Sequence, residues 1–188
     1  MPSAAAWNAV DTILAIVQWI LVVSFPLTVL YAVVSDIRSL KIPNWASIVI
    51  TATFLPAALL GGIDLATIAI HYGIGAAVLA LGTILFALGI VGGGDVKLLA
   101  AIAVWIGWED LGLYLFLVAM TGGALALMIM IIRRFSTIPP RLEAVPWLGR
   151  DPAATQVVPY GVAIGLAAVL LYFRLTVATR AWATFLHS

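Results

Sequence analysis

The sequence predicts an all-α membrane protein whose helices cross the bilayer several times. The 188-residue chain is 64% hydrophobic and 9% charged, and its mean hydropathy is +1.19. A soluble domain usually carries about 25% charged residues. A spanning helix needs about 20 apolar residues, and such runs recur along the whole chain. We therefore expect residues 1–188 to form a single transmembrane domain with six spans.

The first three spans are 12–34, 45–60 and 66–91. The first is a largely apolar run without a charged residue, and it stops just before Asp36. Pro43 is expected in the first turn of the helix that forms the second span, where a proline is well tolerated, and this span ends at a glycine pair. The third ends at a run of three glycines. The second span is short, so we expect it to be tilted or bordered by thinned bilayer.

The last three spans are 96–108, 111–132 and 157–177. The first of these is also short and ends before two acidic residues. The second ends at a pair of arginines, and the third follows a proline-rich connection, 133–156. Prolines exclude a continuous helix in this connection. We interpret it as a surface linker in preference to a substrate-binding element.

Composition excludes several classes of site. The chain has no cysteine, which excludes disulfides, a thiol nucleophile and a zinc–thiolate centre. The chain has only two histidines, which argues against a multi-histidine metal site, so we predict no metal and no cofactor. His71 is expected to pack between helices. The net charge of +1 gives no indication of nucleic-acid binding.

The basic residues predict the orientation of the chain. The positive-inside rule places loops rich in Lys and Arg in the cytoplasm. Acids alone occupy the loops after the second and fourth spans, so these loops and both termini are expected outside a cytoplasmic (inner) membrane. Trp105 and Trp108 are expected in the outer aromatic belt. The basic residues of the cytoplasmic loops are Arg38, Lys41, Lys97, Arg133, Arg134, Arg141 and Arg150.

Two acids, Asp36 and Asp95, are the candidate catalytic residues. Asp36 is expected just past the first span and Asp95 just before the fourth, at one membrane face and one depth. A carboxylate at the edge of a bilayer is costly and is a functional candidate. Two facing carboxyl groups can hydrolyse a peptide, because one accepts a proton from water while the other protonates the scissile carbonyl.

Three short motifs surround these acids. Glycines before Asp95 permit close approach of a substrate backbone, or form a flexible turn. Between Asp36 and the second span, Asn44 is expected to bond free backbone groups at the helix start. The third motif opens the sixth span, where a GxxxG pair permits close helix approach and either packs helices or shapes the cleft. The motif residues are Arg38, Lys41, Pro43, Asn44, Gly92, Gly93, Gly94, Lys97, Pro159, Tyr160, Gly161 and Gly165.

These motifs, D-x-R-x3-I-P-N at 36–44, G-G-G-D-V-K at 92–97 and P-Y-G at 159–161, resemble the prepilin peptidases. These enzymes are type IV leader peptidases of the GxGD class of intramembrane aspartyl proteases. The short Tad/Cpa-type enzymes that process Flp-like prepilins are the most similar. The resemblance implies that Asp36 and Asp95 are catalytic, and that Gly92 and Gly94 are the GxGD glycines.

The resemblance also implies the substrate. A prepilin has a basic leader in the cytoplasm, followed by an apolar helix. Cleavage is expected after a glycine, with a glutamate near the start of the mature helix that Arg38, Lys41 or Lys97 would meet. Partners are thus a prepilin and membrane lipid, with no nucleic acid. The absence of cysteine and the short first loop argue against the methyltransferase activity of the long enzymes.

Helix dipoles suggest different roles for the two acids. Asp95 precedes a helix N-terminus, which favours an anion, whereas Asp36 follows a helix C-terminus. Asp95 is then the readier base and Asp36 the readier proton donor, although Arg38 and Lys41 oppose this assignment.

Three other functions are compatible with the sequence. An archaeal preflagellin-type signal peptidase would use the same two acids. An ion-coupled transporter would use them as carriers, but transporters more often place such residues near the midplane and show internal repeats. A structural membrane subunit would leave the paired acids unexplained. The sequence gives no indication of the oligomeric state.

Overall fold

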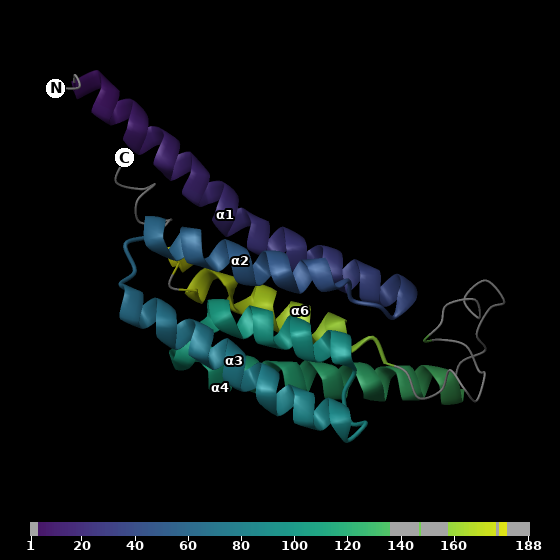
Figure 1. Cartoon of the computed structure of the whole chain (residues 1–188). Helices are drawn as coiled ribbons and strands as arrows, with labels where there is room; N and C mark the ends of the chain where they lie inside the picture. The colour runs from purple at the N-terminus through teal and green to yellow at the C-terminus, as the bar shows by residue number, and fades with distance from the viewer. Residues whose placement is uncertain (1–3, 136–146, 148–157, 176, 180–188) are drawn as a thin grey trace.

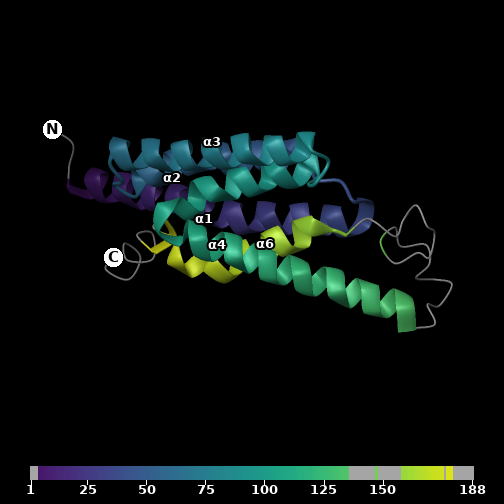
Figure 2. The same ribbon diagram turned by 90° about the horizontal axis from the view of Figure 1, so that it is seen from below.

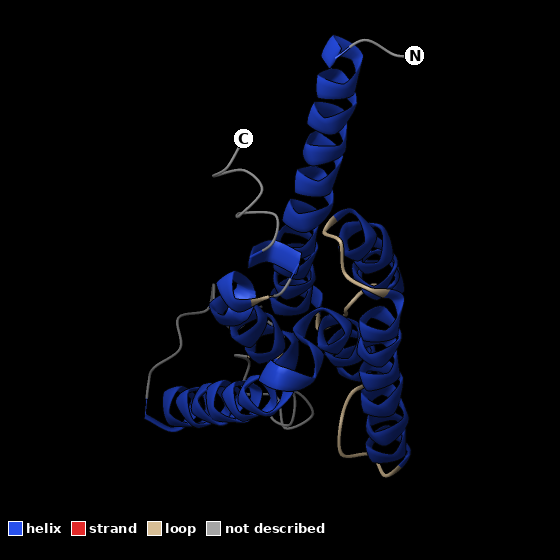
Figure 3. Ribbon diagram, turned by 90° about the vertical axis from the view of Figure 1, so that its left-hand side faces the viewer, coloured by secondary structure: helices blue, strands red, loops and turns tan. Residues whose placement is uncertain are grey.

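The computed structural model describes residues 4–135, 147, 158–175 and 177–179, and all regular structure in these residues is helical (Figure 3). The predicted all-α class is therefore confirmed. Residues 136–146 and 148–157, which include Arg141 and Arg150, lie outside the described residues. The elements are α1 (Ala4–Ser39), α2 (Asn44–Leu60), α3 (Leu65–Ala87), α4 (Gly93–Phe135), α6 (Tyr160–Leu171) and the 3-10 turn η2 (Tyr172–Arg174).

Helix α4 contains both the fourth and the fifth expected spans. At Gly107 the backbone is non-helical (φ 73°, ψ −176°), and the chain doubles back (Figures 1 and 2). A positive φ favours glycine. We call residues 93–106 the first arm of α4 and residues 108–135 its second arm. With the two arms counted separately, the described helices match the six expected spans.

Length and composition make three of the helices suitable for crossing a membrane. These are Thr12–Ser39 of α1, α3 and Gly93–Arg134 of α4. Helix α2, with 17 residues, and α6, with 12 residues, are apolar but shorter. The second span is short as predicted. The sixth is shorter than expected, because α6 passes into η2 at Tyr172.

Trp105 joins three helices at the centre of the core. It is fully buried, its Nε1 donates a hydrogen bond to the carbonyl oxygen of Ile50 (2.6 Å), and its ring lies 4.8 Å from that of Phe25. The expected place of Trp105 in an outer aromatic belt is therefore wrong, because its face of the first arm of α4 is turned toward α1 and α2. Trp108, beyond the reversal at Gly107, is exposed.

Several helix ends near the candidate site residues differ from the boundaries predicted from the sequence. Helix α1 continues to Ser39, so Asp36 lies inside its last turn instead of past its end. Leu40, with φ 53°, terminates the helix. Helix α4 starts at Gly93, so Asp95 belongs to its first turn. Pro43 is extended (φ −69°, ψ 136°) and precedes α2 instead of starting it. Hydropathy marks where side chains become polar, whereas backbone hydrogen bonds decide where a helix stops.

Charged side chains separate to the two ends of the bundle. One end, which we call the aspartate end, gathers the last turns of α1 and α3 and the starts of α2, α4 and α6 (Figure 1). At the opposite end, Asp64 caps α3 by accepting hydrogen bonds from Thr67, and Asp110 pairs with Arg174 at 2.9 Å. These two acids thus have structural roles.

Candidate active site

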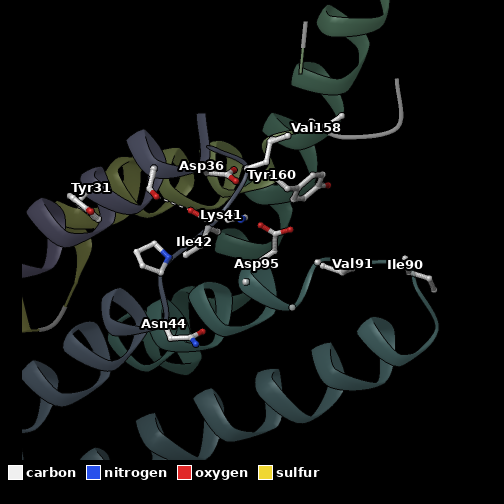
Figure 4. Close-up of a pocket in the computed structure, with 16 residues that line it drawn as sticks. Tyr31, Asp36, Lys41, Ile42, Asn44, Ile90, Val91, Asp95, Val158 and Tyr160 are labelled. Carbon is white, nitrogen blue, oxygen red and sulfur yellow. Dashed lines mark hydrogen bonds between the residues drawn. The ribbon is translucent and has the colours of Figure 1, made fainter. Parts of the chain in front are cut away.

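A cleft of about 1010 Å³ opens at the aspartate end, and both candidate acids line it (Figure 4). Its walls come from the end of α1, the connection to α2, the connection from α3 to α4, and the start of α6. The topology therefore brings together segments that are far apart in the sequence. The lining residues include Tyr31, Ser35, Lys41, Ile42, Pro43, Asn44, Ile90, Val91, Gly92, Gly93, Gly94, Val158 and Tyr160.

Asp36 is buried against the first turn of α6. Its side chain is only 4% exposed, and its Oδ2 accepts a hydrogen bond from the backbone N–H of Gly161 at 2.8 Å. A Cβ at Gly161 would lie 2.8 Å from that oxygen, so this approach requires glycine. One turn further, Gly165 packs directly against Val33 of α1. The GxxxG pair thus both packs α6 on α1 and holds one of the acids, while Pro159 precedes the helix as its N-cap.

Asp95 lies in the first turn of α4, where the glycine run holds it. The backbone N–H of Gly92 donates a hydrogen bond to its carboxylate, as in a capping box. A Cβ at Gly92 would lie 2.7 Å from Asp95 Oδ2. Gly94 faces Ile42, and a Cβ there would lie 3.3 Å from Ile42 Cβ. A side chain at Gly92 would thus clash with the carboxylate of Asp95, and one at Gly94 would crowd Ile42, so the glycines serve close packing and not only the flexibility of a turn.

The two carboxyl groups face one space. Figure 4 shows Asp36, Tyr160 and Asp95 arranged around the same part of the cleft, and the charge of Asp36 acts on Asp95. The ring of Tyr160 packs against the second arm of α4 at Gly122, where a Cβ would lie 2.6 Å from the phenol oxygen. This arrangement provides two acids and an open volume for a substrate.

The dipole contrast expected from the sequence is absent in the structure. Asp95 lies at the N-terminus of α4, and Asp36, although in the last turn of α1, contacts the N-terminus of α6. Both acids therefore face the positive end of a helix. The sequence reasoning considered only the helix that carries each acid, so it missed α6, and dipoles alone do not distinguish a base from a proton donor.

The remaining motif residues divide between the cleft and its rim. Lys41 and Pro43 line the cleft, whereas Arg38 and Lys97 do not. Asn44 also lines it, but its Oδ1 accepts a hydrogen bond from Lys97 Nζ at 2.9 Å, and no side-chain bond caps α2. The expected capping role of Asn44 is therefore wrong.

Several residues of the cleft were not anticipated. Ser35, whose Oγ donates to the carbonyl oxygen of Lys41 at 2.7 Å, precedes Asp36 directly and could have been suspected from that position. Tyr31, Ile90 and Val91 gave no signal, because one more aromatic or apolar residue does not stand out in so apolar a chain.

Trp147 links the second arm of α4 to the end of α1. Its Nε1 donates to the carbonyl oxygen of Ile37 at 2.9 Å, and its own carbonyl oxygen accepts a hydrogen bond from Arg133 at 2.6 Å. Ile37 follows Asp36, so this contact holds the helix end that carries one of the acids. His71 bonds the carbonyl oxygen of Val104 at 2.7 Å and stacks on Phe54, which is the helix-packing role that the sequence predicted.

The described residues contain no group of three or more His, Cys, Asp or Glu side chains that could hold a metal ion. The polar side chains that line the cleft are the carboxyl groups of Asp36 and Asp95, the phenols of Tyr31 and Tyr160, the hydroxyl group of Ser35, the amine of Lys41 and the amide of Asn44.

Comparison with known proteins identifies the family. Residues 23–127 match the type IV leader peptidase family, which is more than half of the chain. The chain belongs to this family. No curated protein and no solved structure matches it. The chain is thus a multi-pass membrane protein of a peptidase family whose substrates are prepilin-like. The match includes Asp36 and Asp95 but not Gly161, which is connected to the site by its hydrogen bond to Asp36.

Proposed function

We propose that this type IV leader peptidase is an aspartic endopeptidase, and that it removes the basic leader from Flp-like type IV prepilins at the cytoplasmic face of the inner membrane. The observation that carries the proposal is the convergence of Asp36 and Asp95 on one cleft. Each acid is oriented by the backbone N–H of a glycine that no larger residue could replace without a clash.

In the proposed mechanism, the two carboxyl groups add water across the scissile peptide bond. One carboxylate takes a proton from water as the water oxygen attacks the carbonyl carbon, and the other carboxylic acid donates a proton to the carbonyl oxygen. Collapse of the intermediate breaks the C–N bond, and the amine leaves with a proton from the dyad. The hydrogen bonds to Gly161 and Gly92 keep both carboxyl groups in place during these steps.

The position of the cleft suits a leader substrate. It lies at the end of the bundle, where a peptide emerging from the bilayer becomes accessible. Arg38, Lys41 and Lys97 lie near this end, which favours a cytoplasmic location by the positive-inside rule. Lys41 is the only one of these three cations that lines the cleft, so it is the best candidate to meet the glutamate of the mature pilin.

Three observations favour this function over the alternatives. Membership of a peptidase family favours hydrolysis over ion-coupled transport. The connection between α1 and α2 is only residues 40–43, and the chain has no cysteine, which supports the short, Tad/Cpa-type enzyme without methyltransferase activity. An archaeal preflagellin-type peptidase would share the two acids, so it is distinguished by its substrate.

The deciding experiment is cleavage of a Flp-type prepilin by the wild type, Asp36→Asn and Asp95→Asn in detergent, followed by the leader-sized mobility shift. We expect the wild type to cut and both variants to fail while they keep the wild-type elution volume and melting temperature. Cleavage by either variant would exclude the dyad. A preflagellin offered in parallel tests the substrate class: a preference for it would exclude the Flp assignment.

A further inference from the structure

A second cavity, of about 700 Å³, lies between α2, α3 and the first arm of α4. We call it the lateral groove. Each helix contributes one face, because its lining residues recur at intervals of three and four positions, the spacing of a helix face. They are Asn44, Ser47, Ile48, Thr51 and Ala52 of α2, Tyr72, Gly75, Ala76 and Leu79 of α3, and Lys97, Ala100, Ala101 and Val104 of α4.

The lateral groove runs from the catalytic cleft toward the middle of the bundle. Asn44 lines both cavities, and it accepts a hydrogen bond from Lys97, which lines the groove. At the other end, Tyr72 donates a hydrogen bond from its hydroxyl group to the carbonyl oxygen of Thr51 at 2.9 Å and links α3 to α2. Lys97 and Val104 are two helical turns apart, so the groove is about 10 Å long.

The walls of the groove are suited to a peptide helix. Ala52, Ala76, Ala100 and Ala101 provide small side chains, which permit close approach of another helix inside a membrane. Ser47 and Thr51 also line the α2 wall, and Asn44 and Lys97 make the end of the groove next to the cleft polar. The groove is thus apolar along its length and polar at the end that faces the cleft.

We propose that the lateral groove binds the first two turns of the substrate's apolar helix. The inference rests on the proposed function, which supplies a substrate with such a helix. The peptide leaves the groove at Asn44 and crosses the cleft past Asp36 and Asp95. Because Lys97 lines the groove and repels a basic leader, the leader lies toward Ile90 and Val91, which Figure 4 shows on the side of the cleft opposite to Asn44.

The test fills the groove and compares two substrates. Ala76 and Ala77 are adjacent, exposed residues of α3, but only Ala76 lines the groove. The substrates are a full prepilin and a short peptide with the leader and cleavage site but no apolar helix. We expect Ala76→Trp to lower the ratio of kcat/KM for the prepilin to kcat/KM for the peptide by about tenfold or more. Ala77→Trp is the matched control, and its ratio should equal that of the wild type.

Cross-linking provides a readout that does not need activity. A photoreactive residue is placed at position 76, 77 or 91 of the full-length Asp95→Asn enzyme in lipid nanodiscs and irradiated with prepilin. Position 76 should give adducts with the start of the apolar helix, position 91 with the leader, and position 77 with lipid. Adducts of position 76 with lipid only, or an unchanged ratio for Ala76→Trp, would overturn the inference. If wild-type enzyme cuts neither substrate, the proposed function itself fails.

Discussion

At the scale of single residues, the site depends on glycines that hold acids in place. Gly92 and Gly161 come from different helices, yet a Cβ at either would lie within 2.8 Å of a carboxylate oxygen, of Asp95 in one case and of Asp36 in the other. Each glycine also donates a backbone hydrogen bond to the carboxyl group that it contacts, Gly92 to Asp95 and Gly161 to Asp36. The glycine run and the P-Y-G motif therefore perform the same physical task for the two acids of the proposed dyad.

Replacement of Gly161 by alanine should displace Asp36 without removing it. We expect kcat to fall by about 100-fold, because a displacement of about 1 Å at a catalytic group costs this much. The measurement is prepilin cleavage at saturating substrate. Gly123→Ala is the control, since a Cβ at this helical position meets nothing within 4 Å, and it should keep wild-type kcat. Wild-type kcat in Gly161→Ala would contradict the positioning role of Gly161.

The dyad should also determine the pH dependence of cleavage. Two carboxyl groups that interact titrate as a pair, and the apparent pKa values belong to the pair. Cleavage needs one group protonated and one ionised, so kcat/KM should fall at low pH, where both are protonated, and at high pH, where both are ionised. A pH–rate profile with one ionisation, measured over the range in which the wild type stays folded, would count against the shared mechanism.

The pairing of Asp36 with Asp95 was predictable, whereas most of their surroundings were not. Both acids border apolar spans, and the alternation of basic and acidic loops places them at one end of the bundle. Side-chain partners depend on helix rotation and packing, which hydropathy does not specify. The contact of Gly161 with Asp36 and the hydrogen bond of Asn44 with Lys97 depend on this packing and could not be predicted from the sequence.

At the scale of elements, the reversal of α4 at Gly107 was predicted to within a few residues, since the acids at 109 and 110 indicate a polar turn. The sequence did not predict how tight this turn is. Gly107 combines a φ of 73° with close contact to His71, whose Cε1 would lie 2.5 Å from a Cβ there. The reversal allows the first arm of α4, which carries Asp95, to pack against α3 and the second arm to pack against Tyr160 of α6.

Gly107→Ala should therefore destabilise the fold. A non-glycine residue in left-handed backbone costs about 1–3 kcal/mol, and the clash with the His71 ring adds to this cost. The midpoint of thermal unfolding in detergent should fall. Gly112→Ala is the control variant, because a Cβ at position 112 meets nothing within 4 Å. An equal midpoint for the two variants would show that the turn tolerates a side chain.

At the scale of the whole molecule, charge divides the two ends of the bundle. Arg38, Lys41 and Lys97 lie at the aspartate end, whereas Asp64 and the Asp110–Arg174 pair lie at the other. The same separation is what the positive-inside rule uses to orient a membrane protein. A basic leader is retained in the cytoplasm, so the proposed cleavage of such a leader requires the aspartate end to face the cytoplasm.

Single cysteines test this orientation directly, because the chain has none of its own. Ser39→Cys lies at the aspartate end and Glu109→Cys at the opposite end, and both positions are exposed. A membrane-impermeant maleimide added to intact spheroplasts should label Glu109→Cys only, and inside-out vesicles should reverse the result. The cysteine-free wild type sets the background, and cleavage by each variant verifies that the labelled protein is functional. Labelling of active Ser39→Cys from outside would place the dyad away from the leader, and a cytoplasmic leader peptidase would then be excluded.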